Sequence, residues 1–428
     1  MTSQAGLLAI LGFTEKINLD SMINGIASND GPRSKFNLKT GIKMTTIGFA
    51  AGARSLLGII STWNDAVLAN IGCLDELPDD STLGRIFKRQ RKQSIADIES
   101  LQLKIEDQIK QKYLSPPIMR MNTRKEEVID IDGTDFVSYG NQQGSVKGFN
   151  HKKKGANCYQ ALLSFDSISK TVKLAWLQSG NTHCANGIVP FTRQLHSHKP
   201  DIRKFYRIDS GFFSGEALDE FESQGNGYLV KAKLTSSIKR QFPELKWKKV
   251  AGKPGKKGWE EATFDHACDG WTRSRLFSVV RIKVDEYQES STLFPEFVIE
   301  KYAYFCYVNT RQMSPWETHR FYGQRATCEN YIEELKNQMN LGKIRSNSFD
   351  ATTLFFHCAI LSYNLMRWMT ICTIKKRMIK WEMSSLRCFL IRISGLLRKP
   401  SGSWVLEFGD KHMYQEELDC WMEFFYSQ

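Results

Sequence analysis

Hydrophobic and polar residues are arranged differently in the first part of the chain and in its middle. Residues 1–122 have mostly helical patterns separated by turns, and no strand-like alternation persists there. After Pro116-Pro117 the pattern changes to helical stretches at 188–198 and 215–224 and to short apolar, β-branched runs at 128–132, 158–165, 172–177, 204–209 and 227–234. This succession predicts a mixed α/β core.

Residues 235–313 are not needed for that α/β pattern. They contain their own strand-like runs, at 277–285 and 297–308, so we expect a β-rich insertion here. The predicted regions are a helical one, the first part of the core, the insertion, the return to the core and a C-terminal region, at 1–122, 123–234, 235–313, 314–345 and 346–428. The last region combines an apolar helix at 354–372 with strand-like runs at 388–397 and 403–408.

The return to the core predicts a helix with a polar stripe. Ser314 and Glu317 have the spacing of a capping box, and the helix is expected to end at Gly342. Gly323 lies in the middle, so two helices are an alternative. At roughly 100° per residue, four polar side chains fall on one narrow stripe beside an apolar face: Tyr322, Arg325, Glu329 and Lys336. A carboxylate among cationic neighbours is a surface that suits phosphate.

Two basic segments are candidates for contact with an anion. Residues 231–257 hold ten lysines and arginines and one acid, and this run includes Lys246, Lys248 and Lys249. Trp247 and Trp259 lie in or just beyond it, so charge for phosphates is combined with aromatic surface for bases. A solvated lysine-rich loop around one buried tryptophan is the alternative.

The second basic segment lies in the N-terminal region. Ser81 is a candidate N-cap for a helix that carries Arg85 and Arg89, and a shorter helical stretch at 63–71 precedes it across a turn. This pair is a candidate helix-turn-helix. A charged face that is only solvated would have the same pattern.

The composition excludes some classes of protein. A chain of 428 residues with 41% hydrophobic and 12% aromatic content can bury a large core, so it is not disordered. Its net charge of +13 suggests an anionic partner, nucleic acid first and a membrane surface second. The ten cysteines form no C-x-x-C pair, which favours reduced thiols in the cytoplasm over zinc. Metal binding by His183 with Cys184, or by His266 with Cys268, is the alternative.

No segment predicts export or a membrane span. The apolar run at 6–13 is short and lacks the basic flank of a signal peptide. The helix expected at 354–372 carries His357, Asn364 and Arg367, so we interpret it as a buried helix. We therefore expect a cytoplasmic protein with no membrane partner.

Carboxylates at two expected strand ends point to metal chemistry. Asp132 closes the first strand, with Asp130 on the same face, and Asp209 closes the fourth. Phosphodiester chemistry is commonly carried out with two divalent ions held by convergent Asp and Glu side chains. A turn or cap role is the alternative for each aspartate alone.

These residues carry a resemblance to a family. Tyr322, Arg325, Glu329 and Lys336 match the Y-x2-R-x3-E-x6-K helix of a group of DDE transposases from bacterial insertion sequences. The chain is similar to that group from about residue 125 to 350, through Ile131-Asp132-Gly133-Thr134, Gly140-x-Gln142, Gly148-Phe149-Asn150 and Arg207-Ile208-Asp209-Ser210-Gly211-Phe212. It departs from the group at Gly133, where serine is common, and at Gly323 inside the signature.

The resemblance implies a ribonuclease H-like core interrupted by the insertion, with a helical DNA-binding region at the N-terminus. Asp132, Asp209 and Glu329 would be the catalytic residues and would hold two Mg²⁺ ions, for which Mn²⁺ can substitute. The reaction implied is cutting of double-stranded DNA at the transposon ends, in some relatives through a hairpin, and transfer of the 3′ hydroxyl into target DNA. A homodimer would pair two ends, in the bacterial cytoplasm.

The resemblance implies that the signature tyrosine, arginine and lysine, Tyr322, Arg325 and Lys336, contact the DNA backbone. The other candidates for DNA contact are the basic residues Lys246, Lys248, Lys249, Arg85 and Arg89. A catalytically inactive, transposase-derived DNA-binding protein is one alternative, although such a protein should have lost an acid and none is missing. A structure-specific nuclease on the same fold is another.

Overall fold

The computed structural model describes residues 1–72, 74, 76–113, 126–148, 155–182, 184–251, 258–284, 297–299, 301–373, 376–398, 405–408 and 412–426. Among these, the expected sheet is present. Its core strands are β1 (Glu126–Val137), β3 (Asn157–Asp166), β4 (Val172–Ser179), β5 (Arg203–Ile208) and β6 (Gly227–Lys231), with β2 (Val146–Lys147) beside β3.

The strand order defines the fold. The core order is β4-β3-β1-β5-β6, in which β3 is antiparallel to β1 and β4, whereas β1, β5 and β6 are parallel. Helix α9 (Ile188–His198) connects β4 to β5, and α10 (Gly215–Ser223) connects β5 to β6. The apolar side chains of both helices form one core with one face of the sheet. This is the mixed α/β, ribonuclease H-like arrangement that was predicted.

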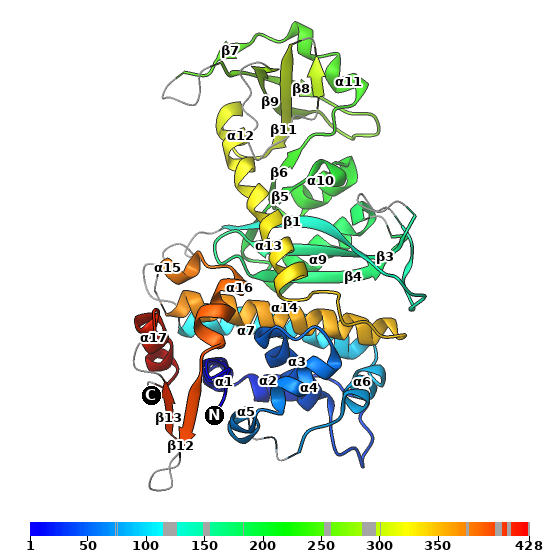
Figure 1. The fold of residues 1–428 in the computed structure, drawn as a ribbon. Coiled ribbons are helices and arrows are strands. Elements are labelled where there is room, and N and C mark those ends of the chain that lie inside the picture. The colour runs from blue at the N-terminus through cyan, green and yellow to red at the C-terminus, as the bar shows by residue number, and fades with distance from the viewer. Residues whose placement is uncertain are drawn as a thin grey trace.

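The insertion continues the same sheet. After α11 (Ser236–Lys239) come β7 (Lys248–Lys249), β8 (Glu260–His266), β9 (Arg275–Lys283), β10 (Phe297–Ile299) and β11 (Tyr302–Asn309). Strand β11 pairs with β6, and the order runs on through β9 and β8 to β7 at the far edge. The β-rich character agrees with the sequence, and Figure 1 shows these strands at the end of the molecule away from both termini.

The other face of the sheet packs against helices from both ends of the chain. The N-terminal helices are α1 (Leu7–Lys16), α2 (Leu19–Asn24), α3 (Leu38–Ala51), α4 (Leu56–Trp63), α5 (Ala66–Ile71), α6 (Asp80–Lys88) and α7 (Lys92–Lys112). They surround α14 (Phe349–Cys372), whose residues from Ala351 to Cys372 are all buried. One hydrophobic core therefore includes residues of the predicted regions 1–122 and 346–428.

No single described helix is long and apolar enough to cross a membrane, although α3 and α4, bent by 89° relative to each other, pass such a test as a pair. Helix α14 carries the buried polar residues His357, Asn364 and Arg367, which have partners within the protein. This agrees with its interpretation as a core helix.

Several local predictions were wrong. Strand β1 does not close at Asp132 but continues to Val137, because β3 pairs with it as far as Val137. Helix α6 is capped by Asp79 instead of Ser81, since the Asp79 carboxylate accepts from the Thr82 N–H. The run at 388–397 is not one strand, because it begins in a π-helical turn (Arg387–Ile391) and only its last residues belong to β12 (Gly395–Arg398). The helices α15 (Lys376–Ile379) and α16 (Met383–Leu386) precede that turn, and β13 (Val405–Phe408) and α17 (Gln415–Tyr426) follow β12.

Candidate active site

Asp132 and Asp209 lie side by side where the pairing of β1 with β5 ends. The parallel register of β1 and β5 pairs Ile131 with Ile208, and this is the last pair of that ladder. Asp132 and Asp209 are each the next residue, so they lie at the same edge of the sheet, about 5 Å apart at the backbone, as expected for adjacent strands. Beyond this point β1 continues with β3 alone, whereas β5 gives way to a 3-10 turn at Ser210–Phe212.

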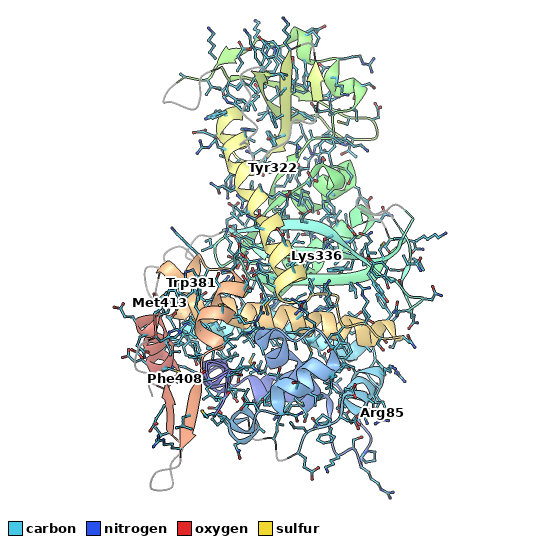
Figure 2. The ribbon with its side chains drawn as sticks, in the orientation of Figure 1. Arg85, Tyr322, Lys336, Trp381, Phe408 and Met413 are labelled. Carbon is cyan, nitrogen blue, oxygen red and sulfur yellow. The ribbon has the colours of Figure 1, made fainter. Side chains whose placement is uncertain are left out.

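The signature segment crosses this edge as one helical rod (Figure 1). It starts at α12 (Pro315–Gly323), where the Ser314 hydroxyl and the Glu317 carboxylate form the predicted capping box. A 3-10 turn (Gln324–Ala326), α13 (Thr327–Glu333) and a π-helical turn (Glu334–Gln338) follow. Gly323 has helical dihedrals, φ −55° and ψ −28°. The irregularity that we expected at Gly323 is thus a tightened turn, and Figure 2 shows Tyr322 and Lys336 on the same rod.

The end of the segment also needs a glycine. Gly342 has a φ of +71°, which is strained for other residues, and a Cβ there would lie 2.7 Å from the Phe136 ring. The chain turns at this position toward α14. The predicted end of the helical segment at Gly342 is therefore close to the observed one.

Glu329 lies one turn beyond Arg325 on α13. Its side chain is exposed and makes no hydrogen bond or ion pair with the residues that the structure describes. The three acids influence one another: burial raises the pKa of Asp132, the nearby Asp209 and Glu329 raise it further, and Arg325 opposes them. A concentration of negative charge with free carboxylate oxygens is what a divalent cation requires.

The other three signature residues face strand β1 and its neighbour β5. An Nη2 atom of Arg325 lies 2.9 Å from Asp132 Oδ1, and the Tyr322 hydroxyl donates to Asp209 Oδ1 at 3.3 Å. The Lys336 ammonium donates to the Thr134 hydroxyl at 3.1 Å and to the Asp135 carbonyl at 2.6 Å. The polar stripe of the helical segment therefore faces the part of the sheet that carries Asp132 and Asp209.

Asp130 is in a different environment from Asp132, although both belong to the same strand. The Arg207 guanidinium donates to both of its carboxylate oxygens, at 2.6 and 2.8 Å, and both residues are buried. Arg207 also donates to the Phe321 carbonyl at 2.9 Å and to Gln324 Oε1 at 3.2 Å. Asp130 thus neutralises the arginine that ties β1 and β5 to the signature segment.

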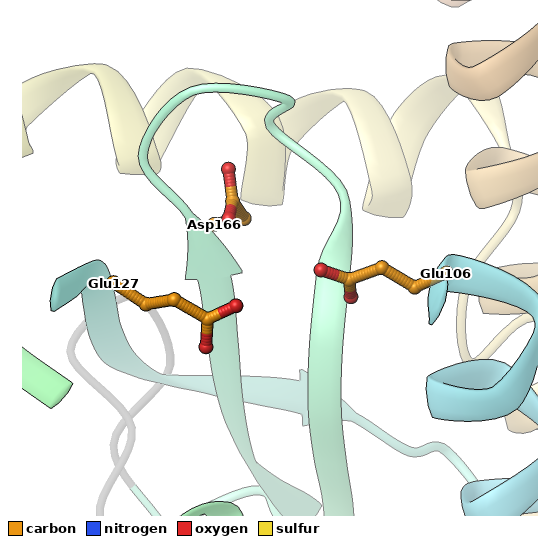
Figure 3. A group of neighbouring side chains, drawn as sticks. All are labelled: Glu106, Glu127 and Asp166. Atoms are coloured by element: carbon orange, nitrogen blue, oxygen red, sulfur yellow. The ribbon is translucent and has the colours of Figure 1, made fainter. Parts of the chain in front are cut away.

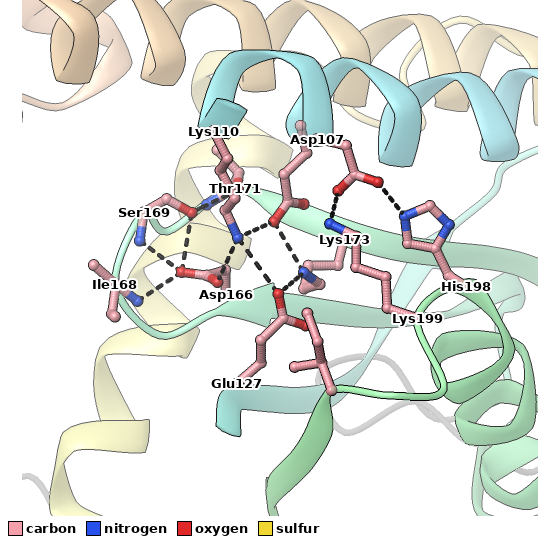
Figure 4. Close-up of polar contacts among 12 residues, drawn as sticks. Asp107, Lys110, Glu127, Asp166, Ile168, Ser169, Thr171, Lys173, His198 and Lys199 are labelled. Atoms are coloured by element: carbon pink, nitrogen blue, oxygen red, sulfur yellow. Dashed lines mark hydrogen bonds and ion pairs between the residues drawn. The ribbon is translucent and has the colours of Figure 1, made fainter. Parts of the chain in front are cut away.

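A separate group of carboxylates, Glu106, Glu127 and Asp166, comes close enough together to hold a metal ion (Figure 3). Its charge is already matched by lysines. Lys173 lies 2.9 Å from Glu106 and 3.3 Å from Glu127, Lys110 contacts all three acids, and Lys204 lies 3.4 Å from Glu127. Figure 4 shows lysine ammonium groups between the carboxylates.

We interpret this group as a buried ion-pair network that joins α7 to β1, β3 and β4. A cation placed there would have to displace an ammonium group. Sequence reasoning missed the network. The one available signal was Lys173, a charged residue inside an apolar strand run, and such residues are rarely buried without partners.

The predicted DNA-binding residues outside the signature are spread over two distant surfaces. Lys246, Lys248 and Lys249 are exposed, the last two on the edge strand β7. Trp247 and Trp259 are half-buried: Arg281 lies 4.1 Å from the centroid of Trp247, and Trp259 packs against Trp316 and Phe305. The aromatic surface for bases stays a prediction. Lys253, Lys256 and Lys257 of the basic run lie outside the described residues.

Arg85 and Arg89 line a hollow of about 660 Å³ on the N-terminal helices (Figure 2 labels Arg85). Its other charged members are Lys35, Lys88 and Arg91. Arg85 and Lys88 are exposed, whereas Arg89 donates to Ser34 and to the Phe36 carbonyl and lies 3.6 Å from Asp30. Helix α6 packs against α3, α4 and α14, so this surface is held rigidly.

Asp132, Asp209 and Glu329 offer oxygen ligands for a divalent metal, although their ligand atoms do not converge as closely as those of Glu106, Glu127 and Asp166. Asp132 and Asp209 each have one carboxylate oxygen that accepts no hydrogen bond from the described residues, and both oxygens of Glu329 are in this state. All three are hard oxygen donors from different elements, the ligand set that Mg²⁺ prefers. The strand order of the core places the chain in the ribonuclease H-like class of folds.

Comparison with known proteins identifies the family within that class. The family model described as transposase DDE domain group 1 matches residues 1–425, and the chain belongs to this family of DDE transposases. No curated protein sequence matches the chain significantly. Among solved structures, it is similar to the piggyBac transposase in a synaptic complex with hairpin DNA, determined by cryo-EM. The identity is 11% and the TM-score 0.47, with 90% of this chain and 79% of that chain covered.

Proposed function

We propose that this protein is the active transposase of a bacterial insertion sequence, in the group with the Y-x2-R-x3-E-x6-K helix. It binds the terminal inverted repeats of its element, cuts the DNA there and joins the freed 3′ end to target DNA. The observation that carries this proposal is the register of β1 and β5, which aligns Asp132 with Asp209 beneath the helix of Glu329.

Asp132, Asp209 and Glu329 are the proposed ligands of two Mg²⁺ ions, with Mn²⁺ as a substitute. When bound, such ions activate the attacking oxygen and stabilise the leaving one. The sheet holds the protein's part of this site in place, because Asp132 lies within β1, paired with β3, and Asp209 directly follows β5, which pairs with β1 and β6. Glu329 sits on a helix that Arg207 ties to the same strands.

Double-stranded DNA is the proposed partner, at the element's ends and at the target. Contacts to its backbone are supported by cations in three places: the exposed Lys246, Lys248 and Lys249 at the edge of the insertion, the exposed Arg85 and half-buried Arg89 in the basic hollow, and the half-buried Lys336 near the acids. We further propose that a homodimer pairs two ends and that the protein works in the bacterial cytoplasm.

The experiment that tests the proposal compares nicking of a DNA duplex containing the element's end by the wild-type protein and by Glu329→Gln. Loss of Mg²⁺-dependent nicking in the variant is expected. Asp201→Asn is the matched control, since Asp201 is exposed and lies before β5, at the opposite end of that strand from Asp209. Equal nicking by wild type and Glu329→Gln would contradict the assignment.

A second assay separates a transposase from a nuclease. The substrate is a precut end with a free 3′ hydroxyl, incubated with a supercoiled target plasmid and Mg²⁺. Joined products that depend on Asp132 and Asp209 are expected. Cleavage in the first assay without joining in the second would favour the structure-specific nuclease.

A further inference from the structure

Two residues of the signature stripe, Tyr322 and Arg325, are buried within the protein. The exposed fractions of Tyr322 and Arg325 are 2% and 4%. The resemblance leads to an expectation of DNA contacts for both. In this conformation their polar ends are instead directed at the two aspartates of the sheet edge.

Each of the two side chains contacts only one oxygen of its aspartate. Asp132 Oδ1 accepts from the Gly133 N–H at 2.9 Å and lies 2.9 Å from Arg325, whereas Oδ2 accepts no hydrogen bond from the described residues. Asp209 shows the same division, because Oδ1 takes the Tyr322 hydroxyl and Oδ2 accepts nothing. On both aspartates one oxygen is held and the other is left for a ligand.

The holding groups are themselves fixed by packing. The Tyr322 ring lies 5.0 Å from the Tyr307 ring, in a buried cluster with Phe205 and Phe305. The packed ring holds the hydroxyl against Asp209 Oδ1, to which it donates at 3.3 Å. The Arg325 guanidinium also donates to the Ile131 carbonyl at 3.4 Å and lies over the Tyr322 ring.

Arg325 has an additional unused donor. Its Nε is buried and has no hydrogen-bond partner among the described residues. A buried guanidinium with an unsatisfied N–H is costly, so packing alone would not favour arginine at this position. The cost is understandable if the side chain is needed for its charge beside Asp132.

We propose that Tyr322 and Arg325 are positioning residues that orient the metal-binding carboxylates of Asp209 and Asp132. Each one holds a single oxygen and so turns the second oxygen of its aspartate toward the cation. Hydrogen-bonding partners behind metal ligands commonly change metal affinity by 10- to 100-fold. The inference rests on the proposed function.

The test measures Mn²⁺ binding to the full-length protein without DNA, by the EPR signal of free Mn²⁺. We expect Tyr322→Phe and Arg325→Lys each to weaken binding by about tenfold. Both substitutions keep the net charge, so a general electrostatic effect does not explain a change. Tyr322→Phe also keeps the packed ring, and it therefore tests the inference even if Arg325→Lys fails to fold.

The matched controls lie in the same helical segment. Tyr331→Phe and Arg320→Lys make the same chemical changes at residues that contact neither aspartate, and they should bind Mn²⁺ as the wild type does. Wild-type Mn²⁺ affinity in both Tyr322→Phe and Arg325→Lys would overturn the positioning role. If Asp132→Asn did not weaken Mn²⁺ binding in the first place, the proposed metal site itself would fail, which is a distinguishable result.

Discussion

Arg207 forms a two-pronged ion pair with Asp130 immediately below the candidate metal ligands. The two residues lie two positions before Asp209 and Asp132 on adjacent parallel strands, with donor–acceptor distances of 2.6 and 2.8 Å. Because side chains two residues apart share one face of a strand, the ion pair and the aspartates form consecutive rows on one face of the sheet. In the first row Asp130 is neutralised by Arg207, whereas in the second row Asp132 and Asp209 are the proposed ligands of a cation.

This arrangement predicts different outcomes for two neighbouring aspartates. Asp132→Asn should abolish Mg²⁺-dependent nicking, because the proposed metal site loses a charged ligand. Asp130→Asn should leave Arg207 buried without a counter-charge and destabilise the fold by roughly 3 kcal/mol, while Mn²⁺ binding persists. Denaturant unfolding and the nicking assay measure these two effects. An inactive Asp130→Asn beside a still-cutting Asp132→Asn would reverse the assignment.

The π-helical turn of the signature segment is held by a second buried ion pair. Arg367 of α14 donates to both oxygens of Glu334, at 2.9 and 2.8 Å. Arg367→Met should therefore destabilise the protein by about 3–5 kcal/mol, because Glu334 would be left buried and unpaired. The double variant Arg367→Met with Glu334→Leu should recover most of this loss. Thermal unfolding of the three proteins checks the prediction, and a double variant no more stable than Arg367→Met would contradict it.

The buried ion-pair network of Glu106, Glu127 and Asp166 predicts how the free energy of unfolding changes at low pH. Burial alone would raise the pKa of Glu127, but Lys173, Lys110 and Lys204 outweigh it and hold the pKa at about 2, below the ordinary 4.5. A depressed carboxyl pKa contributes stability above the unfolded value, and that contribution is lost as the pH falls from about 4.5 toward 2. The loss for Glu127 is of the order of 3 kcal/mol.

Unfolding free energies of the wild type and Glu127→Gln, measured between pH 7 and 2, provide the check. The variant should have a smaller pH dependence in the window from 4.5 to 2. Mn²⁺ should not stabilise the wild type through this network, so Glu127→Gln should also keep Mn²⁺ binding. Parallel stability curves for the two proteins would contradict the ion-pair interpretation.

The basic hollow makes a prediction about salt. If Arg85 and Lys88 contact DNA phosphates, the double variant Arg85→Gln with Lys88→Gln should bind end-containing DNA more weakly. The slope of log affinity against log salt concentration should fall by roughly 1.8. Lys104→Gln is the control, because Lys104 is exposed on α7 and does not line the hollow. An unchanged slope in the double variant would remove the hollow from the DNA path.

Much of the fold could be predicted from local pattern. The core strands and the helices α9 and α10 were found within a few residues, since β-branched runs and capping residues are local signals. The end of β1 was not found, because its last residues are strand only through their pairing with β3. The helical run before β12 was likewise missed, although its buried residues Met383, Leu386, Arg387, Leu390 and Ile391 follow the helical period.

For the candidate site, the candidate residues and the helix face on which four of them lie followed from the sequence alone. The helical period places Tyr322, Arg325, Glu329 and Lys336 on one stripe, and the local pattern predicts Asp132 and Asp209 at strand ends. Which of these side chains contact one another depends on the tertiary structure. The register of two strands 77 residues apart in sequence aligns the aspartates, gives Asp130 to Arg207, and buries Tyr322 and Arg325 against carboxylates. Such pairings depend on distances between remote segments, and no local pattern of residues encodes them.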